Sequence, residues 1–159
     1  MPKTDNGGLF KNVLFCTDFS TNADRAFGFA VEEARRGGSG VLRLLHVIPE
    51  PDAQFWRAYI NDIDGVNRKA YHDINAKVQE TYSKRMPADL RLEVAILIGV
   101  DAVEILKYAA EVKADLLVVG RQGRSPLGRV LFGSVAEKVV RKAECAVLVV
   151  PLVAASGDA

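Results

Sequence analysis

The stretch 115-DLLVVGRQGRSPLGRVLFGSVAEKVVRKAECAVLVV-150 decides the fold class of this chain. It begins and ends in short apolar runs, Asp115 to Val119 and Ala146 to Val150, which are typical of strands covered on both faces. Between them, Ser134 and Glu137 have the spacing of a capping box for a helix that runs through Lys142. A strand, a helix and a second strand in this order predict a parallel β-α-β unit with a right-handed crossover.

The rest of the chain repeats this pattern. Apolar runs at 12–17, 41–48 and 90–98 predict three more strands. Helical patterns follow each of them: one begins at the capping box Thr21-Asn-Ala-Asp24, one carries an apolar stripe over 70–82, and one begins at Asp101 with Glu104. The sequence therefore predicts an α/β fold: a doubly wound five-stranded parallel sheet with helices on both faces.

Composition predicts a single domain over residues 1–159, with a core at about 10–151 and flexible termini. The net charge of +1 gives no field that would attract nucleic acid or a membrane surface, so neither partner is expected. The first residues lack the apolar core of a signal peptide, which makes the cytoplasm the expected location. Cys16 and Cys145 lie inside apolar runs, and with two distant histidines they give no zinc spacing.

Glycines and arginines gather after the fourth predicted strand. Gly120 and Gly123 permit tight turns and a close approach of a ligand to the backbone. Gly133 and Ser134 open a helix, whose free N–H groups and dipole favour an anion. No acidic residue occurs from 116 to 136, whereas three arginines do: Arg121, Arg124 and Arg129. Ligands of such sheets bind beyond the carboxyl ends of the strands, where this stretch lies. Its glycines, its arginines and the beginning of a helix together suit a polyphosphate.

Each of these features also has a purely structural explanation. Ser134 and Asp18 could simply cap the helices that follow them, and the arginines could be an exposed surface. His46, at the end of the second strand, is expected to be a structural, hydrogen-bonded histidine. The familiar nucleotide motifs are missing: there is no G-x-x-x-x-G-K-[ST] loop and no G-x-G-x-x-G after a strand. P-loop ATPases and ordinary dinucleotide dehydrogenases are thereby excluded.

Gly120-x2-Gly123-x9-Gly133-Ser134 resembles the G-x2-G-x9-G-[ST] motif of the ATP-binding branch of the universal stress protein family. The opening 13-VLFCTDFS-20, the segment 44-LLHV-47 and the closing 145-CAVLVVP-151 are also similar to that family, so the resemblance spans roughly residues 10 to 151. It implies a Rossmann-like sheet of the adenine nucleotide alpha hydrolase type with strand order 3-2-1-4-5.

The resemblance also implies roles for individual residues. Thr17, Asp18 and Ser20 would line the adenosine side, and Val47 would meet the adenine edge through its backbone. The remaining expected contacts are Gly99 near the adenine, Gly120 at the ribose, and Gly123, Arg129, Gly133, Ser134 and Val135 at the phosphates. Many relatives have Gly-x-Pro where this chain has Gly99-Val100-Asp101, so Asp101 is expected to act there as a helix cap instead.

The function expected from this resemblance is that of an ATP-binding, nucleotide-dependent switch in a stress response, with Mg²⁺ accompanying the triphosphate. Two alternatives stay open: a slow ATPase, and an interaction module that ignores nucleotide. Asp18 is the only obvious carboxylate near the site, so at most very slow hydrolysis is expected. The last strand, Ala146 to Val150, is apolar and is expected at a sheet edge; the resemblance implies a homodimer that pairs through it.

Overall fold

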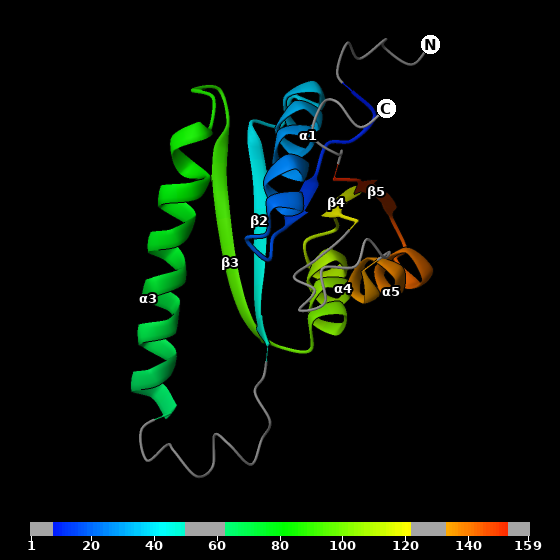
Figure 1. Cartoon of the computed structure of the whole chain (residues 1–159). Helices are drawn as coiled ribbons and strands as arrows, with labels where there is room; N and C mark the ends of the chain where they lie inside the picture. Colours follow the sequence, from blue (N-terminus) through cyan, green and yellow to red (C-terminus); the bar gives the residue numbers. More distant parts are fainter. Residues whose placement is uncertain (1–7, 50–62, 122–132, 153–159) are drawn as a thin grey trace, which may run out of the picture.

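A single parallel sheet forms the centre of the computed structural model, which describes residues 8–49, 63–121 and 133–152 (Figure 1). Its strands are β1 (Val13–Cys16), β2 (Val41–Pro49), β3 (Arg91–Gly99), β4 (Leu116–Gly120) and β5 (Ala146–Val150). They lie in the order β3-β2-β1-β4-β5, and all pairs are parallel. The predicted fold class and strand order are confirmed.

The helices cover both faces of the sheet (Figure 1). They are α1 (Thr21–Gly37), α3 (Ile63–Thr81), α4 (Asp101–Glu111) and α5 (Ser134–Lys142), with a short 3₁₀ turn, η1 (Ser83–Arg85). Along β1, Val13 and Phe15 pack on the face covered by α1 and α3, whereas Leu14 and Cys16 pack on the face covered by α4 and α5. This two-sided burial explains why β1 is apolar throughout.

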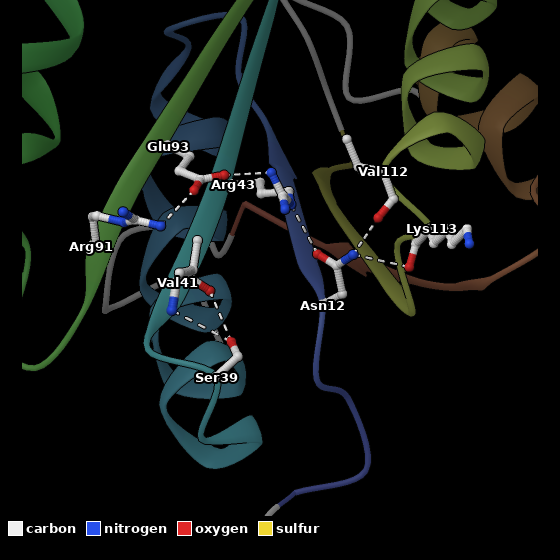
Figure 2. Close-up of polar contacts among 8 residues, drawn as sticks. All are labelled: Asn12, Ser39, Val41, Arg43, Arg91, Glu93, Val112 and Lys113. Carbon is white, nitrogen blue, oxygen red and sulfur yellow. Dashed lines mark hydrogen bonds and ion pairs between the residues drawn. The ribbon is translucent and has the colours of Figure 1, made fainter.

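Polar side chains close the end of the sheet where the strands begin (Figure 2). The amide of Asn12 donates to the main-chain oxygens of Val112 and Lys113, and its oxygen accepts from Arg43 Nε at 3.2 Å. Arg43 also forms an ion pair with Glu93 on the neighbouring strand. These contacts link the beginning of β1 to the end of α4 and to β2 and β3. The loops at the opposite end of the sheet carry the residues predicted to bind a ligand.

Candidate functional site

The candidate site lies where the order of the strands reverses. β1 is paired with β2 on one side and with β4 on the other. The chain leaves β1 for α1 on one face of the sheet, and it leaves β4 for α5 on the other face. In α/β sheets, the carboxyl ends of two strands related in this way are the usual place for a ligand to bind.

Hydrogen bonds fix the turn between β1 and α1. The hydroxyl oxygen of Thr17 accepts from Phe19 N at 2.9 Å and lies 2.5 Å from the hydroxyl of Tyr82. Asp18 Oδ1 accepts from Ser20 N at 2.9 Å. Ser20 Oγ accepts from Ala23 N at 3.1 Å, so Ser20 is the N-cap of α1. The prediction that Thr21 begins a capping box was therefore wrong by one residue, because Ser20 has the extended backbone of an N-cap and Thr21 is already helical.

Phe19 has a φ angle of +61°, which is rare for a bulky residue. Its ring centroid lies 4.8 Å from that of His46, and Lys77 Nζ lies 4.5 Å from the centre of the ring. A left-handed conformation costs roughly 1–2 kcal/mol in a non-glycine residue. The packing of this ring and the hydrogen bond to its N–H therefore have to hold the turn in place.

His46 extends the contact between β2 and the same turn. Its Nδ1 lies 2.8 Å from the main-chain oxygen of Thr17, which can only accept, so Nδ1 carries the proton. Burial lowers the pKa of His46, and the neighbouring Thr17 oxygen, Asp18 and Asp101 offset part of that effect. The ring is therefore neutral at pH 7, with Nε2 as an acceptor. The prediction of a structural, hydrogen-bonded histidine is confirmed for Nδ1.

The main chain of Val47 faces the side of β2 that β1 has left. Pairing of β1 with β2 ends at Cys16 and Leu45, and Thr17 N donates to Leu45 O at 3.0 Å. Main-chain groups point to the two neighbours alternately along a strand, so Val47, two residues after Leu45, points the same way. Because β1 turns away at Thr17, it offers no further partner to the N–H and C=O of Val47.

The segment after β3 differs from its prediction. Helix α4 begins at Asp101 itself, Val100 occupies the N-cap position, and no side chain caps this end. The expectation that Asp101 caps α4 was thus wrong. Its Oδ1 is buried and has no hydrogen-bond partner, and burial raises the pKa of this carboxyl group. Gly99 is buried, and an added Cβ there would lie 2.7 Å from Glu104 Cγ.

Gly120 lies at the end of β4, close to the beginning of α1. A Cβ at this position would lie 3.0 Å from Asn22 Cγ and 3.2 Å from its main-chain carbon. Close packing against α1 is therefore a structural reason for glycine here, in addition to the predicted contact with a ribose.

The beginning of α5 returns to the end of β4. Gly133 N donates to Arg121 O at 2.7 Å, and Arg121 N donates to Val150 O at 2.8 Å. Gly133 is the N-cap of α5 and has no side chain to cap it, so the predicted capping box at Ser134 was wrong. Ser134 is exposed and Val135 is half-buried. Among the described residues, no acceptor bonds the N–H groups of Ser134 and Val135.

The carboxyl end of the sheet thus brings together several of the predicted residues: Thr17, Asp18, Ser20 and Val47 on the β1–β2 side, and Gly120, Gly133, Ser134 and Val135 on the β4 side. Gly99 lies at the far end of the same sheet edge, on β3. Gly123 and Arg129 lie outside the described residues. Asn22, Lys77 and Tyr82 border the site and were not predicted, because in the sequence they read as ordinary helix residues.

Two negative findings apply to the described part of the chain. It contains no group of three or more His, Cys, Asp or Glu side chains placed to hold a metal ion. Within the same residues, no helix combines the length and apolar character needed to cross a membrane.

The chain is similar in sequence and in structure to known proteins. A universal stress protein of Methanocaldococcus jannaschii is 33% identical over 154 residues, covering 89% of this chain and 82% of that protein. The solved structure of the universal stress protein UspA from Lactobacillus plantarum has a TM-score of 0.72 at 27% identity, covering 91% of this chain and 99% of that one.

Two similar solved structures contain adenine nucleotides. One is a universal stress protein in complex with cAMP, with a TM-score of 0.62 at 25% identity, covering 89% of this chain and 97% of that one. The other is the Archaeoglobus fulgidus universal stress protein in complex with dAMP, with a TM-score of 0.58 at 25% identity, covering 90% and 99%. The model of the universal stress protein family matches residues 9–151, and this chain therefore belongs to the universal stress protein family.

Proposed function

We propose that this universal stress protein binds ATP at the carboxyl ends of β1 and β4 and acts as a nucleotide-dependent switch in a stress response. The observation that carries the proposal is the return of Gly133 to the end of β4, through its hydrogen bond to Arg121. It sets the beginning of α5 beside the strand ends, where the free N–H groups favour a phosphate. The similar proteins in complex with cAMP and dAMP support an adenine nucleotide.

The base and the phosphates would bind at different strands. Val47 offers one N–H and one C=O toward the candidate site, a donor and acceptor pair that fits the N1 and N6 edge of adenine and mismatches guanine. Gly120 lets the ribose approach the backbone, with Asp18 as acceptor for its hydroxyl groups. Gly133, Ser134 and Val135 would hold the phosphates, together with Gly123 and Arg129 from the intervening loop.

Hydrolysis would be slow in this arrangement. Asp18 accepts a hydrogen bond from Ser20 N and helps to shape the turn, which does not suit it to act as a general base. Mg²⁺ would be held mainly by phosphate oxygens and water, since the described residues offer no cluster of ligands. Slow hydrolysis favours a switch over an ATPase.

The proposal extends to assembly and location. In β5, Ala146 is exposed and the next three residues are half-buried, so this apolar edge strand needs a cover. A second copy of the chain, paired with β5 across a two-fold axis, would supply it. The free Cys16 and Cys145 fit the reducing cytoplasm.

The experiment that tests the proposal is identification of the nucleotide released when the purified protein is denatured, followed by a phosphate-release assay. The expected results are an adenine nucleotide and turnover far below 1 s⁻¹, a rate at the low end for enzymes. Turnover near or above that rate would contradict the switch and favour an ATPase. Release of a guanine or flavin nucleotide would contradict the proposed site.

A further inference from the structure

Tyr82 is a core residue whose hydroxyl reaches the candidate site. It follows α3 directly and is 0% exposed. Its ring packs between Phe15, Phe27 and Phe19, at centroid distances of 5.5, 4.8 and 5.9 Å. A buried tyrosine usually directs its hydroxyl to the nearest surface or polar partner. Here the partner is the hydroxyl of Thr17, at the end of β1.

The hydroxyl of Tyr82 keeps its proton under all ordinary conditions, because burial raises the pKa of Tyr82 to about 12. Thr17 Oγ1 has two lone pairs, so it can accept from Tyr82 and from Phe19 N at the same time. The two hydrogen bonds link α3 to the main chain of the β1–α1 turn. Thr17 is 5% exposed, so little water competes for them.

This link bears on the strained residue of the turn. Phe19 has φ +61° between Asp18 and Ser20, two residues of the proposed nucleotide site. If Phe19 relaxed to a negative φ, the peptide groups on both sides would rotate, and Asp18 Oδ1 would lose Ser20 N. The hydrogen bond from Phe19 N to Thr17, with Tyr82 as the outer support, opposes that relaxation.

We propose that Tyr82 is a positioning residue for the nucleotide site: through Thr17, its hydroxyl holds the β1–α1 turn in the conformation that presents Asp18 and Ser20 to the ligand. The inference rests on the proposed ATP site. It also makes the end of α3 a support of the turn. Lys77 of the same helix, whose ammonium lies 4.5 Å from the centre of the Phe19 ring, adds a second contact of this kind.

The test compares Tyr82→Phe with Tyr71→Phe in the full chain. Each variant loses only a hydroxyl group. Tyr71 lies within α3 and Tyr82 follows its last residue. Tyr71 is half-buried and has no hydrogen bond among the described residues. Tyr82→Phe is expected to weaken ATP binding about 3- to 10-fold, the effect of one net hydrogen bond, whereas Tyr71→Phe is not. Amide hydrogen exchange without nucleotide should accelerate at Phe19 and Ser20 in Tyr82→Phe alone.

A pair of Thr17 backgrounds separates positioning from general stability. In Thr17→Ser, which keeps the hydroxyl, Tyr82→Phe should still weaken ATP binding; in Thr17→Val it should have no further effect. A thermal unfolding scan checks that each variant is folded. If Tyr82→Phe is not, the single variants Thr17→Val and Thr17→Ser are compared instead: amide exchange at Phe19 and Ser20 should be faster in Thr17→Val, and equal exchange in the two would overturn the inference.

The possible failures differ. If the wild type binds ATP and Tyr82→Phe binds it equally well, the inference is overturned and the proposed function stands. An equal loss in both Thr17 backgrounds would assign Tyr82 to the core alone and would also overturn it. If the wild type binds no adenine nucleotide, the proposed function fails first and the inference falls with it.

Discussion

The side-chain amide of Asn22 donates a hydrogen bond of 2.8 Å to the main-chain oxygen of Val150. Asn22 lies in the first turn of α1 and is 2% exposed, and Val150 is the last residue of β5. The same oxygen accepts from Arg121 N at 2.8 Å. One carbonyl group therefore joins the beginning of α1 to the ends of β4 and β5, and Gly120 packs directly against this junction.

Gly120→Ala is expected to destabilise the protein and to weaken ATP binding. The added Cβ would lie 3.0 Å from Asn22 Cγ and 3.2 Å from its main-chain carbon, so α1 or β4 has to shift. Overpacking of this kind costs about 1–3 kcal/mol. Urea unfolding measures the cost. The matched control is Gly28→Ala in α1, where an added Cβ meets nothing within 4 Å and should be neutral or stabilising. Equal stability of the two variants would refute the packing argument.

Substitutions at the beginning of α5 test the phosphate site. Ser134→Ala should leave unfolding nearly unchanged, because Ser134 does not cap the helix, while ATP affinity falls roughly 10- to 100-fold on loss of a charge-assisted bond. Gly133→Val should cost more affinity, since its branched side chain blocks the approach of phosphate to the backbone. Ser39→Ala, at the other end of the sheet, is the control. A stability loss of about 1 kcal/mol in Ser134→Ala with unchanged ATP affinity would show that Ser134 caps the helix and would contradict its contact with phosphate.

Proline substitutions in β5 test the dimer prediction, because each removes a single main-chain N–H group. Arg121 N donates to Val150 O, so the main chain of Val150 faces β4, and by alternation that of Leu148 does as well. Val147 and Val149 then point their N–H groups away from β4. Val147→Pro should remove edge pairing and give a monomer in light scattering, because edge strands tolerate proline. Leu148→Pro is the control and should unfold the sheet edge by breaking the β4 ladder. A wild type that is monomeric at micromolar concentration would contradict the dimer itself.

Stability should fall in mild acid because of His46. Its pKa is lowered in the fold, so the unfolded chain binds the proton more readily. The contribution of His46 is complete above the ordinary value of 6.5 and is lost as the pH falls from there to the lowered pKa. The charged groups around it are Asp18, Asp101 and Lys77. Asp101, whose pKa is raised by burial, acts in the opposite sense as the pH falls from that raised pKa to its ordinary value of 3.8.

The variant His46→Asn isolates this effect. Its amide can donate to Thr17 O as Nδ1 does, but it does not titrate. The expected result is a flatter dependence of unfolding free energy on pH just below 6.5 than in the wild type, whatever the absolute stability. Parallel pH profiles for the two proteins would show that another group is responsible.

The fold could be predicted from the sequence because its strands are apolar on both faces and its helices are amphipathic. The helix starts could not be predicted to the residue. Ser134 and Thr21 have the right chemistry for a cap, but Gly133 and Ser20 occupy the N-cap positions because the backbone is extended at these two residues and helical from the next one.

The sequence could predict that Thr17, Val47 and Gly120 lie at the carboxyl ends of their strands, but not which side chains support them there. Tyr82 continues an apolar helical stripe, so its spacing indicates core, and only the three-dimensional contact with Thr17 gives it another role. The isolated carboxylate of Asp101 was expected to cap a helix; its orphaned Oδ1 follows from the packing around β3 and α4, which a linear pattern does not encode.

Calorimetric titration of nucleotide-free protein with ATP and, in parallel, with GTP tests the central claim most directly. The account predicts that ATP binds and that GTP binds at least 10-fold more weakly, because the main chain of Val47 offers a donor and an acceptor that match adenine, a difference of about 1.4 kcal/mol or more. Binding of GTP as tight as that of ATP, or no heat with either nucleotide, would contradict it.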